Sequence, residues 1–203
     1  GNAELGAAVM KSLTIALFAA LVTLVIGATA SLAWLRFGKV GRGLIEAVSV
    51  TPIALPGLFV GVVLLVLFAQ AGVQLSSVTI VISLVVIALP IVIVAMKARL
   101  ALVDPSLEEA ARDLGASQMQ TFSRVTLPLI APTLISTSIL AFAISFDEFV
   151  VTSFVAGTET TLPMYIWSMM RRTVTPLVNA ISTFALFFSI AILLGAALLA
   201  RLR

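Results

Sequence analysis

Residues 47–96 read AVSVTPIALPGLFVGVVLLVLFAQAGVQLSSVTIVISLVVIALPIVIVAM, a run of fifty residues without a charged side chain. An α-helix needs about 20 residues to cross the hydrocarbon core of a bilayer, so this run is long enough for two crossings. The stretch AGVQLSS at residues 71–77 is rich in turn-forming residues and divides the run. The pattern therefore predicts one membrane span at residues 47–70 and a second at residues 78–96.

Other uncharged runs predict three further spans. The runs lie at residues 12–35, 125–146 and 173–200. The spans predicted from them cover residues 12–35, 132–156 and 177–200. The fourth span along the chain carries Asp147 and Glu148 just beyond its uncharged run. The sequence thus predicts an all-α fold, a polytopic membrane helix bundle with five transmembrane helices.

The composition supports the membrane class and excludes several others. Apolar residue types make up 61% of the chain and charged residues only 10%, whereas about a quarter of an average soluble domain is charged. A water-soluble monomer of this size could not bury so much apolar surface. The chain has no Cys and no His, which excludes thiolate zinc sites, imidazole-ligated metals and His-based triads. We expect no metal site and no catalytic residue in this chain.

Lys and Arg residues are unequally divided between the two sets of loops, nine on one side and three on the other. The nine are Arg36, Lys39, Arg42, Lys97, Arg99, Arg112, Arg124, Arg201 and Arg203, and the three are Lys11, Arg171 and Arg172. Short loops rich in Lys and Arg face the cytoplasm. This predicts an outside N-terminus, a cytoplasmic C-terminus and basic residues that serve the lipid bilayer rather than nucleic acid. Because an outside N-terminus needs a preceding hydrophobic segment, we expect one more span upstream of Gly1.

The predicted cytoplasmic loop, residues 97–127, has strong signals for a short helix. Asp104 suits an N-cap with Pro105 at the first helical position. Gly115 suits the left-handed residue that follows a helix end. The residues between them form one apolar stripe at helical spacing. The stripe consists of Leu107, Ala110, Ala111 and Leu114.

A second short helix follows in the same loop. Ser117 and Gln120 form a plausible capping box at its start, and we expect Leu127 and Pro128 to end it at the membrane. Two readings of this helix–turn–helix remain open. The loop packs only on its own bundle, or its small, Ala-faced first helix inserts into a groove of another protein.

The loop also contains a set of fixed spacings. Glu109, Ala110 and Ala111 are followed after three residues by Gly115, after nine more by Val125, and then by Leu127 and Pro128. This pattern resembles the EAA motif of the membrane permeases of binding-protein-dependent ABC importers, in which Ile is usual at the position of Val125. Three other segments resemble the spermidine/putrescine-type branch of these permeases. They are residues 144–157, 162–169 and 174–180.

The resemblance implies a mechanism. Residues 1–203 would form an ABC-importer permease domain, the core of a fold that has one more helix upstream. This subunit would form half of a pore in the bacterial inner membrane with a second, homologous permease subunit. An extracytoplasmic binding protein would deliver a polyamine or another small amine-bearing solute. A dimer of ATPase subunits would bind ATP and Mg and dock on the coupling loop 97–127. The residues implied in coupling are Glu109, Ala110, Ala111, Gly115, Leu127 and Pro128.

This chain has no Gly-rich phosphate loop of its own, so it is expected to be a transport subunit rather than an enzyme and to hold no cofactor. Two other function classes were weighed against this one. A secondary transporter would need buried ionisable residues on several helices and internal repeats, whereas one acidic pair and no convincing repeat are found. A membrane scaffold without an ATPase partner has no use for a capped loop helix or for buried acids.

The acidic pair in the fourth span marks a predicted substrate path. A charged side chain at that depth costs on the order of 3 kcal/mol or more unless it has a partner. On one continuous helix Asp147 and Glu148 point about 100° apart, and Glu148 shares a face with Thr152, so we expect Glu148 to face the pore. Asn179 in the fifth span is a candidate polar companion. The alternative is an ion pair of an acid with Lys11, Arg171 or Arg172 that holds an outer gate shut.

Overall fold

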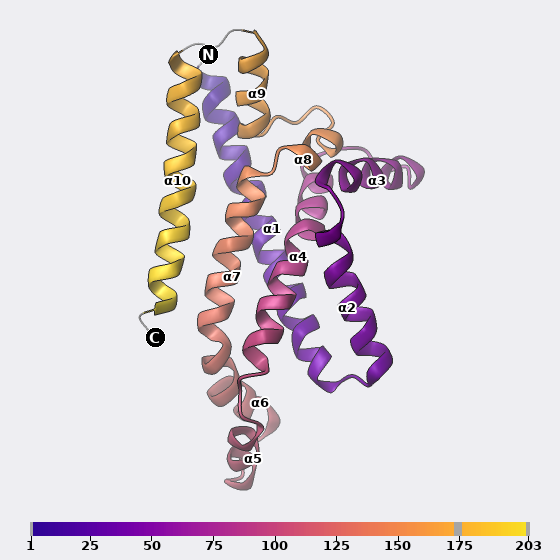
Figure 1. Cartoon of the computed structure of the whole chain (residues 1–203), viewed down its shortest axis with the longest axis vertical. Helices are drawn as coiled ribbons and strands as arrows, with labels where there is room; N and C mark the ends of the chain where they lie inside the picture. Colours follow the sequence, from indigo (N-terminus) through magenta and orange to yellow (C-terminus); the bar gives the residue numbers. More distant parts are fainter. Residues whose placement is uncertain (1, 173–175, 202–203) are drawn as a thin grey trace.

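The structure is a computed structural model that describes residues 2–172 and 176–201 of the 203-residue chain. Its long helices are α1 (Asn2–Arg36), α4 (Ser77–Leu100), α7 (Leu127–Asp147) and α10 (Pro176–Arg201). They run close to the long axis of the molecule (Figure 1), where α1 packs against α4 and α7 and α10 packs against α7. Of the described helices, α1, α4 and the helical stretch that ends with α7 are long and apolar enough to cross a membrane. The prediction of an all-α polytopic membrane bundle is confirmed.

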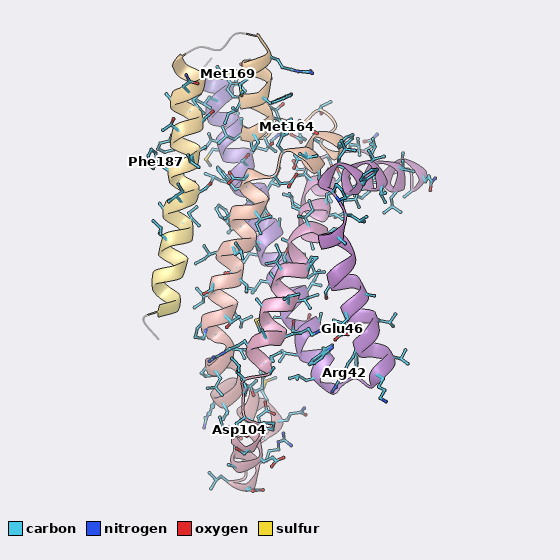
Figure 2. The ribbon with its side chains drawn as sticks, in the orientation of Figure 1. Arg42, Glu46, Asp104, Met164, Met169 and Phe187 are labelled. Atoms are coloured by element: carbon cyan, nitrogen blue, oxygen red, sulfur yellow. The ribbon has the colours of Figure 1, made fainter. Side chains whose placement is uncertain are left out.

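Small residues allow close approach of the helices at particular points, and many large apolar residues are exposed on the outside. A Cβ on Gly27 of α1 would lie 2.6 Å from the Val92 side chain of α4, so the two helices approach closely at this glycine. Phe18 of α1 and Phe187 of α10 are exposed, and Phe187 points away from the bundle (Figure 2). This arrangement suits lipid, which solvates large apolar side chains while helices associate through close packing of small ones.

The second predicted span is divided into two helices. The structure forms α2 (Lys39–Ala54) and α3 (Gly57–Gln70), and α3 lies across the other helices rather than along them (Figure 1). Pro56 causes the break, because it disfavours a helical conformation at Leu55 and has no N–H to continue the ladder. Pro56 itself has φ −58° and ψ 139°. A single helix over residues 47–70 is therefore not formed.

The fourth predicted span also differs from the expectation of one helix over residues 132–156. Helix α7 ends at Asp147, Glu148 is extended with φ −70° and ψ 112°, and a short helix α8 (Val150–Val155) follows. The side chain of Glu148 accepts a hydrogen bond from the N–H of Val151 at 2.9 Å. This contact stabilises the start of α8, where the β-branched residues after Phe149 favour helix only weakly.

One end of the bundle, where α1 and α4 end and α2 begins, is called the foot, and a polar and aromatic cluster holds it together. Lys97 of α4 donates to Glu46 of α2 at 2.9 Å and lies 4.4 Å from the ring centroid of Trp34. Arg42 donates to the carbonyl oxygens of Trp34 and Leu35, at 3.1 Å each. Figure 2 labels Arg42 and Glu46 at this end of α2. The cluster fastens α2 to the last turn of α1 and to α4.

The opposite end is held by a second polar cluster around the connection from α8 to α9 (Leu162–Arg172). Glu159 forms an ion pair with Lys11 of α1 and accepts a hydrogen bond from Ser77 of α4 at 3.1 Å. Nearby, the N–H of Leu162 donates to Ser12 of α1 at 2.7 Å. One connection thereby joins the N-terminal parts of α1 and α4.

Candidate functional site: the coupling loop and the broken helix

The first predicted loop helix is present as α5 (Pro105–Asp113) and is capped as the sequence indicates. The carboxylate of Asp104 accepts a hydrogen bond from the N–H of Ser106 at 2.9 Å, and Pro105 occupies the first turn. The backbone and side-chain hydrogen bonding to Ser106 lowers the pKa of Asp104, because the bond is made to the charged form of the carboxyl. Figure 2 shows Asp104 at the foot of the molecule.

Gly115 ends α5 in the conformation that was expected. Its φ is +83°, and two hydrogen bonds close the helix end, from Gly115 N–H to the Arg112 oxygen at 2.9 Å and from Ala116 N–H to the Ala111 oxygen at 3.1 Å. These two bonds define a Schellman motif. A Cβ at Gly115 would meet no atom within 4 Å. The requirement for glycine here therefore comes from the backbone angle and not from crowding within this chain.

The loop presents an apolar surface that none of the described residues covers. Leu114 is 90% exposed and Met119 is 73% exposed, and Glu109 and Ala110 are exposed beside them. Ala111 is half-buried. Exposed apolar side chains on a loop outside the bilayer mark an interaction surface. This favours insertion into another protein over packing on the chain's own bundle.

The second loop helix starts as expected and then continues. Ser117 accepts from the N–H of Gln120 at 3.3 Å, and the Gln120 side chain accepts from the N–H of Ser117 at 2.8 Å, which is a capping box. The helix passes from α6 (Gln118–Thr121) through a π-helical turn η1 (Phe122–Thr126) into α7. The expectation that Leu127 and Pro128 end it is therefore wrong.

The π-turn explains how the helix passes Pro128. A proline ring collides with the carbonyl four residues earlier, and its nitrogen cannot donate. In the structure the N–H of Leu127 bonds to the oxygen of Phe122, five residues earlier. This wider turn relieves the conflict, so Leu127 and Pro128 lie exposed at the foot of α7 rather than at a helix end. A single π-turn within an α-helix is frequent at functional sites.

The two acids lie where α7 stops. Asp147 is the last residue of α7 and Glu148 is the first residue of the break. Both carboxylate oxygens of Asp147 accept from the hydroxyl of Ser189, at 3.3 and 3.1 Å. Ser189 lies thirteen residues from the start and twelve from the end of α10 (189 − 176 and 201 − 189). The break in α7 is thus level with the middle of a neighbouring span.

The other two residues of the predicted path differ in position, because Thr152 directly follows Val151, which bonds to Glu148, whereas Asn179 lies away from the acids. Thr152 is 1% exposed within α8. Asn179 is exposed near the start of α10, ten residues before Ser189 and therefore about 15 Å away along the helix axis. The expected face shared by Glu148 and Thr152 does not exist, because the helix that would create it ends at Asp147.

The alternative, an ion pair of an acid at an outer gate, is not formed with Lys11 or Arg171 in the part of the chain that the structure describes. Lys11 pairs with Glu159, and the guanidinium of Arg171 lies 5.7 Å from the ring centroid of Trp167. The Arg172 side chain lies outside the described residues. Asp147 and Glu148 are instead held by a hydroxyl and by a backbone N–H.

Sequence reasoning missed three contacting residues. Ser189 is a lone hydroxyl in an apolar run, which is a weak signal. Glu108 and Thr126 stand directly beside motif residues, and the structure joins their side chains at 2.5 Å. No group of three or more potential metal ligands occurs among the described residues. The described residues thus include an exposed apolar surface on the loop and an acidic break level with the middle of α10.

Known proteins share both the sequence and the fold of this chain. Residues 23–203 match the family described as "Binding-protein-dependent transport system inner membrane component". The chain is 34% identical over 201 residues to the spermidine/putrescine transport system permease protein PotC of Escherichia coli, covering 98% of this chain and 76% of that protein. It is 37% identical over 187 residues to the putrescine transport system permease protein PotI of the same species, covering 88% and 66% respectively.

Two solved structures resemble the fold. A chain of the MetNI methionine ABC transporter in an inward-facing conformation superposes with a TM-score of 0.78 at 18% identity, covering 96% of this chain and 93% of that chain. A chain of an amino acid ABC transporter crystallised with histidines superposes with a TM-score of 0.76 at 16% identity, covering 98% and 94%. The fold is therefore that of a membrane subunit of an ABC transporter.

With the sequence match added, the chain belongs to the family of inner membrane components of binding-protein-dependent transport systems. It is a multi-pass membrane permease and not an enzyme, as the EAA-like spacing predicted. The resemblance to the spermidine/putrescine-type branch is confirmed by PotC and PotI.

Proposed function

We propose that this chain forms half of the translocation pore of an ATP-driven importer and that the transported solute is a polyamine or another small amine-bearing cation. The observation that carries the substrate class is the break in α7 at Asp147 and Glu148. Backbone without helical hydrogen bonds is tolerated at membrane depth only where protein buries it or where it lines a wet cavity. Two carboxylates at such a point attract a cation rather than an anion, and relatives are named for spermidine and putrescine transport.

The coupling loop supports the proposed partners. Residues 97–127 dock on an ATPase dimer, which binds ATP and Mg, through the exposed face that contains Glu109 and Ala110. Gly115 shapes this loop, and Leu127 and Pro128 form the foot of the helix behind it. A homologous second permease completes the pore, and a binding protein delivers the solute. The excess of Lys and Arg at the loop end supports an orientation with that end in the cytoplasm, the start of the chain outside and its C-terminus inside.

Reconstitution tests the proposed function directly. The full-length permease is co-expressed with its partner permease, ATPase and binding protein, and ATP hydrolysis is measured in proteoliposomes with spermidine, putrescine, glutamate and an aminophosphonate. We expect spermidine or putrescine to stimulate hydrolysis and glutamate to have no effect. Stimulation by glutamate alone would contradict the cationic substrate. An ATPase that never co-purifies would favour a secondary transporter or a scaffold instead.

Glu148→Gln separates a substrate role from a gate role. The amide oxygen still accepts from the Val151 N–H, so the start of α8 is retained while the charge is lost. A hydrogen bond between charged groups contributes about 1.5–3 kcal/mol, so we expect the half-saturating concentration of a cationic solute to rise roughly tenfold or more. Basal ATP hydrolysis and assembly should remain unchanged. Raised basal hydrolysis with normal cation uptake would indicate a gate and contradict the substrate role.

A further inference from the structure

The coupling helix α5 is attached to the rest of the chain mainly on one side. It packs chiefly against α6 and η1. A cavity of about 1080 Å³ lies between this hairpin and the ends of α1 and α4, and its lining includes Leu32, Leu35, Leu100, Val103 and Phe122. A displacement of α5 is therefore not transmitted to α1 or α4 by close packing. Apart from the connection to α4 at residues 101–104, the contacts of α5 lead into the bundle through the segment that becomes α7.

A side-chain hydrogen bond marks this route. Glu108 lies on the inner side of α5, and its Oε1 atom accepts from the Thr126 hydroxyl at 2.5 Å. Thr126 is 4% exposed and immediately precedes α7. The second carboxylate oxygen of Glu108 lies 3.3 Å from Arg112 on the same helix. Because a hydrogen bond to an ionised acceptor is stronger than a neutral one, this contact fixes α5 to the end of the π-turn.

The foot of α7 is also held from the other side. Arg99, near the end of α4, donates twice to the carbonyl oxygen of Leu129, at 2.9 and 2.7 Å. From this foot α7 runs for 21 residues to Asp147, roughly 32 Å at 1.5 Å per residue. Its far end is the acidic break at Asp147. One helical stretch thus connects the docking loop to the predicted substrate path.

We propose that Glu108 is a positioning residue that fixes the coupling helix to the foot of α7 through Thr126, so that displacement of α5 is transmitted along α7 to the break after Asp147. This inference rests on the proposed docking of α5 on an ATPase. Two adjacent acids then have separate roles, since Glu109 is exposed for the partner whereas Glu108 faces inward. The π-turn provides a helical connection past Pro128 that remains continuous.

The attachment can be measured without the ATPase. Residues 1–203 contain no Cys, so the substitutions Ser106→Cys on α5 and Ile135→Cys on α7 add one pair of spin-label sites, and any Cys elsewhere in the full-length permease pair is replaced by Ser. Pulsed electron–electron double resonance of the full-length permease pair in nanodiscs measures the distribution of distances between the two labels. We expect a narrow distance distribution with Thr126 intact. In Thr126→Val the distribution should be at least about 1.5 times as wide, and in Thr126→Ser it should return to the width of the wild type. Ser123→Ala is the matched control, because this exposed hydroxyl bonds only within its own turn, to the Gln120 oxygen.

Transport completes the test. In the reconstituted importer, Thr126→Val should keep ATPase assembly and hydrolysis but lower the solute moved per ATP by roughly tenfold or more, the ratio that corresponds to one hydrogen bond to a charged group. Thr126→Ser should behave as wild type. A Thr126→Val protein with an unchanged distance distribution and an unchanged transport ratio overturns the inference. If no ATPase associates with the wild-type permease, the proposed function fails, while the label distances still decide whether Glu108 and Thr126 hold α5.

Discussion

Gly115 acts through its backbone rather than through the absence of a side chain. Its φ of +83° lies in the left-handed region, where a residue with a Cβ is disfavoured by on the order of 1 kcal/mol. The space around it is open within this chain. A substitution would therefore reshape the end of α5 first and crowd a docked partner second.

Gly115→Val should abolish most transport while the binding protein still delivers solute to the outer face. A β-branched residue tolerates the left-handed region least, whereas Asn tolerates it better, so Gly115→Asn should retain more activity. Gly43→Ala is the control, since a Cβ there also meets no atom within 4 Å and its φ is not positive. Uptake assays and co-purification with the ATPase measure the effect. If the Gly115→Val protein takes up solute at the wild-type rate, Gly115 has no role in coupling.

Among the elements, α3 packs on α8 and approaches it most closely at Gly61. A Cβ on Gly61 would lie 2.6 Å from a ring carbon of Phe154, whereas a Cβ on Gly57 would lie 3.9 Å from Val151. Val60, Leu64 and Phe68 of α3 are buried in the same core cluster as Val151 and Val155. The packing of α3 on α8 thus combines an apolar cluster with one glycine that leaves room for an aromatic ring.

Gly61→Val should destabilise the protein by about 1–3 kcal/mol through overpacking. Gly57→Ala, one turn earlier, makes only an ordinary contact and should change stability little. Adding Phe154→Leu to Gly61→Ala should recover part of the loss suffered by Gly61→Ala alone, because the ring is the group that collides. Thermal unfolding in lipid nanodiscs measures all of these proteins. Equal unfolding temperatures for Gly61→Val and Gly57→Ala would contradict the close-contact argument.

At the scale of the whole molecule, the two ends of the bundle are fastened by different polar clusters. Trp34, Arg42, Glu46 and Lys97 hold the foot. Glu159 joins α1 and α4 at the other end through Lys11 and Ser77. Between them the helices contact through apolar and small residues. Movement passed along α7 would have to proceed between these two fixed ends.

The contribution of Glu159 should depend on pH in a defined direction. The hydrogen bond from Lys11 is the largest cause that lowers the pKa of Glu159 below its ordinary 4.5. A lowered pKa in the folded state contributes stability that is present above pH 4.5 and is lost as pH falls through the lowered value. At neutral pH Glu159→Gln should therefore lower the stability by up to about 1 kcal/mol, the usual range for an accessible ion pair.

The difference in the free energy of unfolding between Glu159→Gln and wild type should shrink as the pH falls well below 4.5. Thermal unfolding at several pH values measures it. Asp113→Asn, an exposed acid on α5, is the matched control and should give no comparable difference at neutral pH. If the stability difference between Glu159→Gln and wild type grows on acidification, the assigned direction of the pH dependence is wrong.

Several features followed from short stretches of sequence. The caps at Asp104 and Ser117 and the left-handed Gly115 are local arrangements, in which residues within a few positions satisfy each other's backbone groups. Spans such as α1 and α4 followed from the length of uncharged runs alone. The spacing that begins at Glu109 identified the family, and the matching relatives confirm it.

The breaks within the membrane were less predictable. Prolines signalled irregularity at Pro56 and Pro128, yet the first ended a helix while the second was passed by a π-turn. Nothing near Asp147 resembled a helix end, because the run from Ala143 to Val155 is uniformly apolar apart from the acids and short hydroxyl side chains. A helical register extended across this point placed Glu148 and Thr152 on one face, which the structure does not form.

The sequence by itself determined the membrane class, the helical fold, the capped docking loop and the family, since each depends on hydrophobic length or on neighbours a few residues apart. Only the tertiary structure decided that Asp147 meets Ser189, that Lys11 meets Glu159, and that Glu108 meets Thr126. The physical reason lies in the apolar helices of a membrane bundle. Their faces are nearly alike in hydrophobicity, so no periodicity reveals which face turns inward, and the partners of each polar group are fixed only when the helices pack.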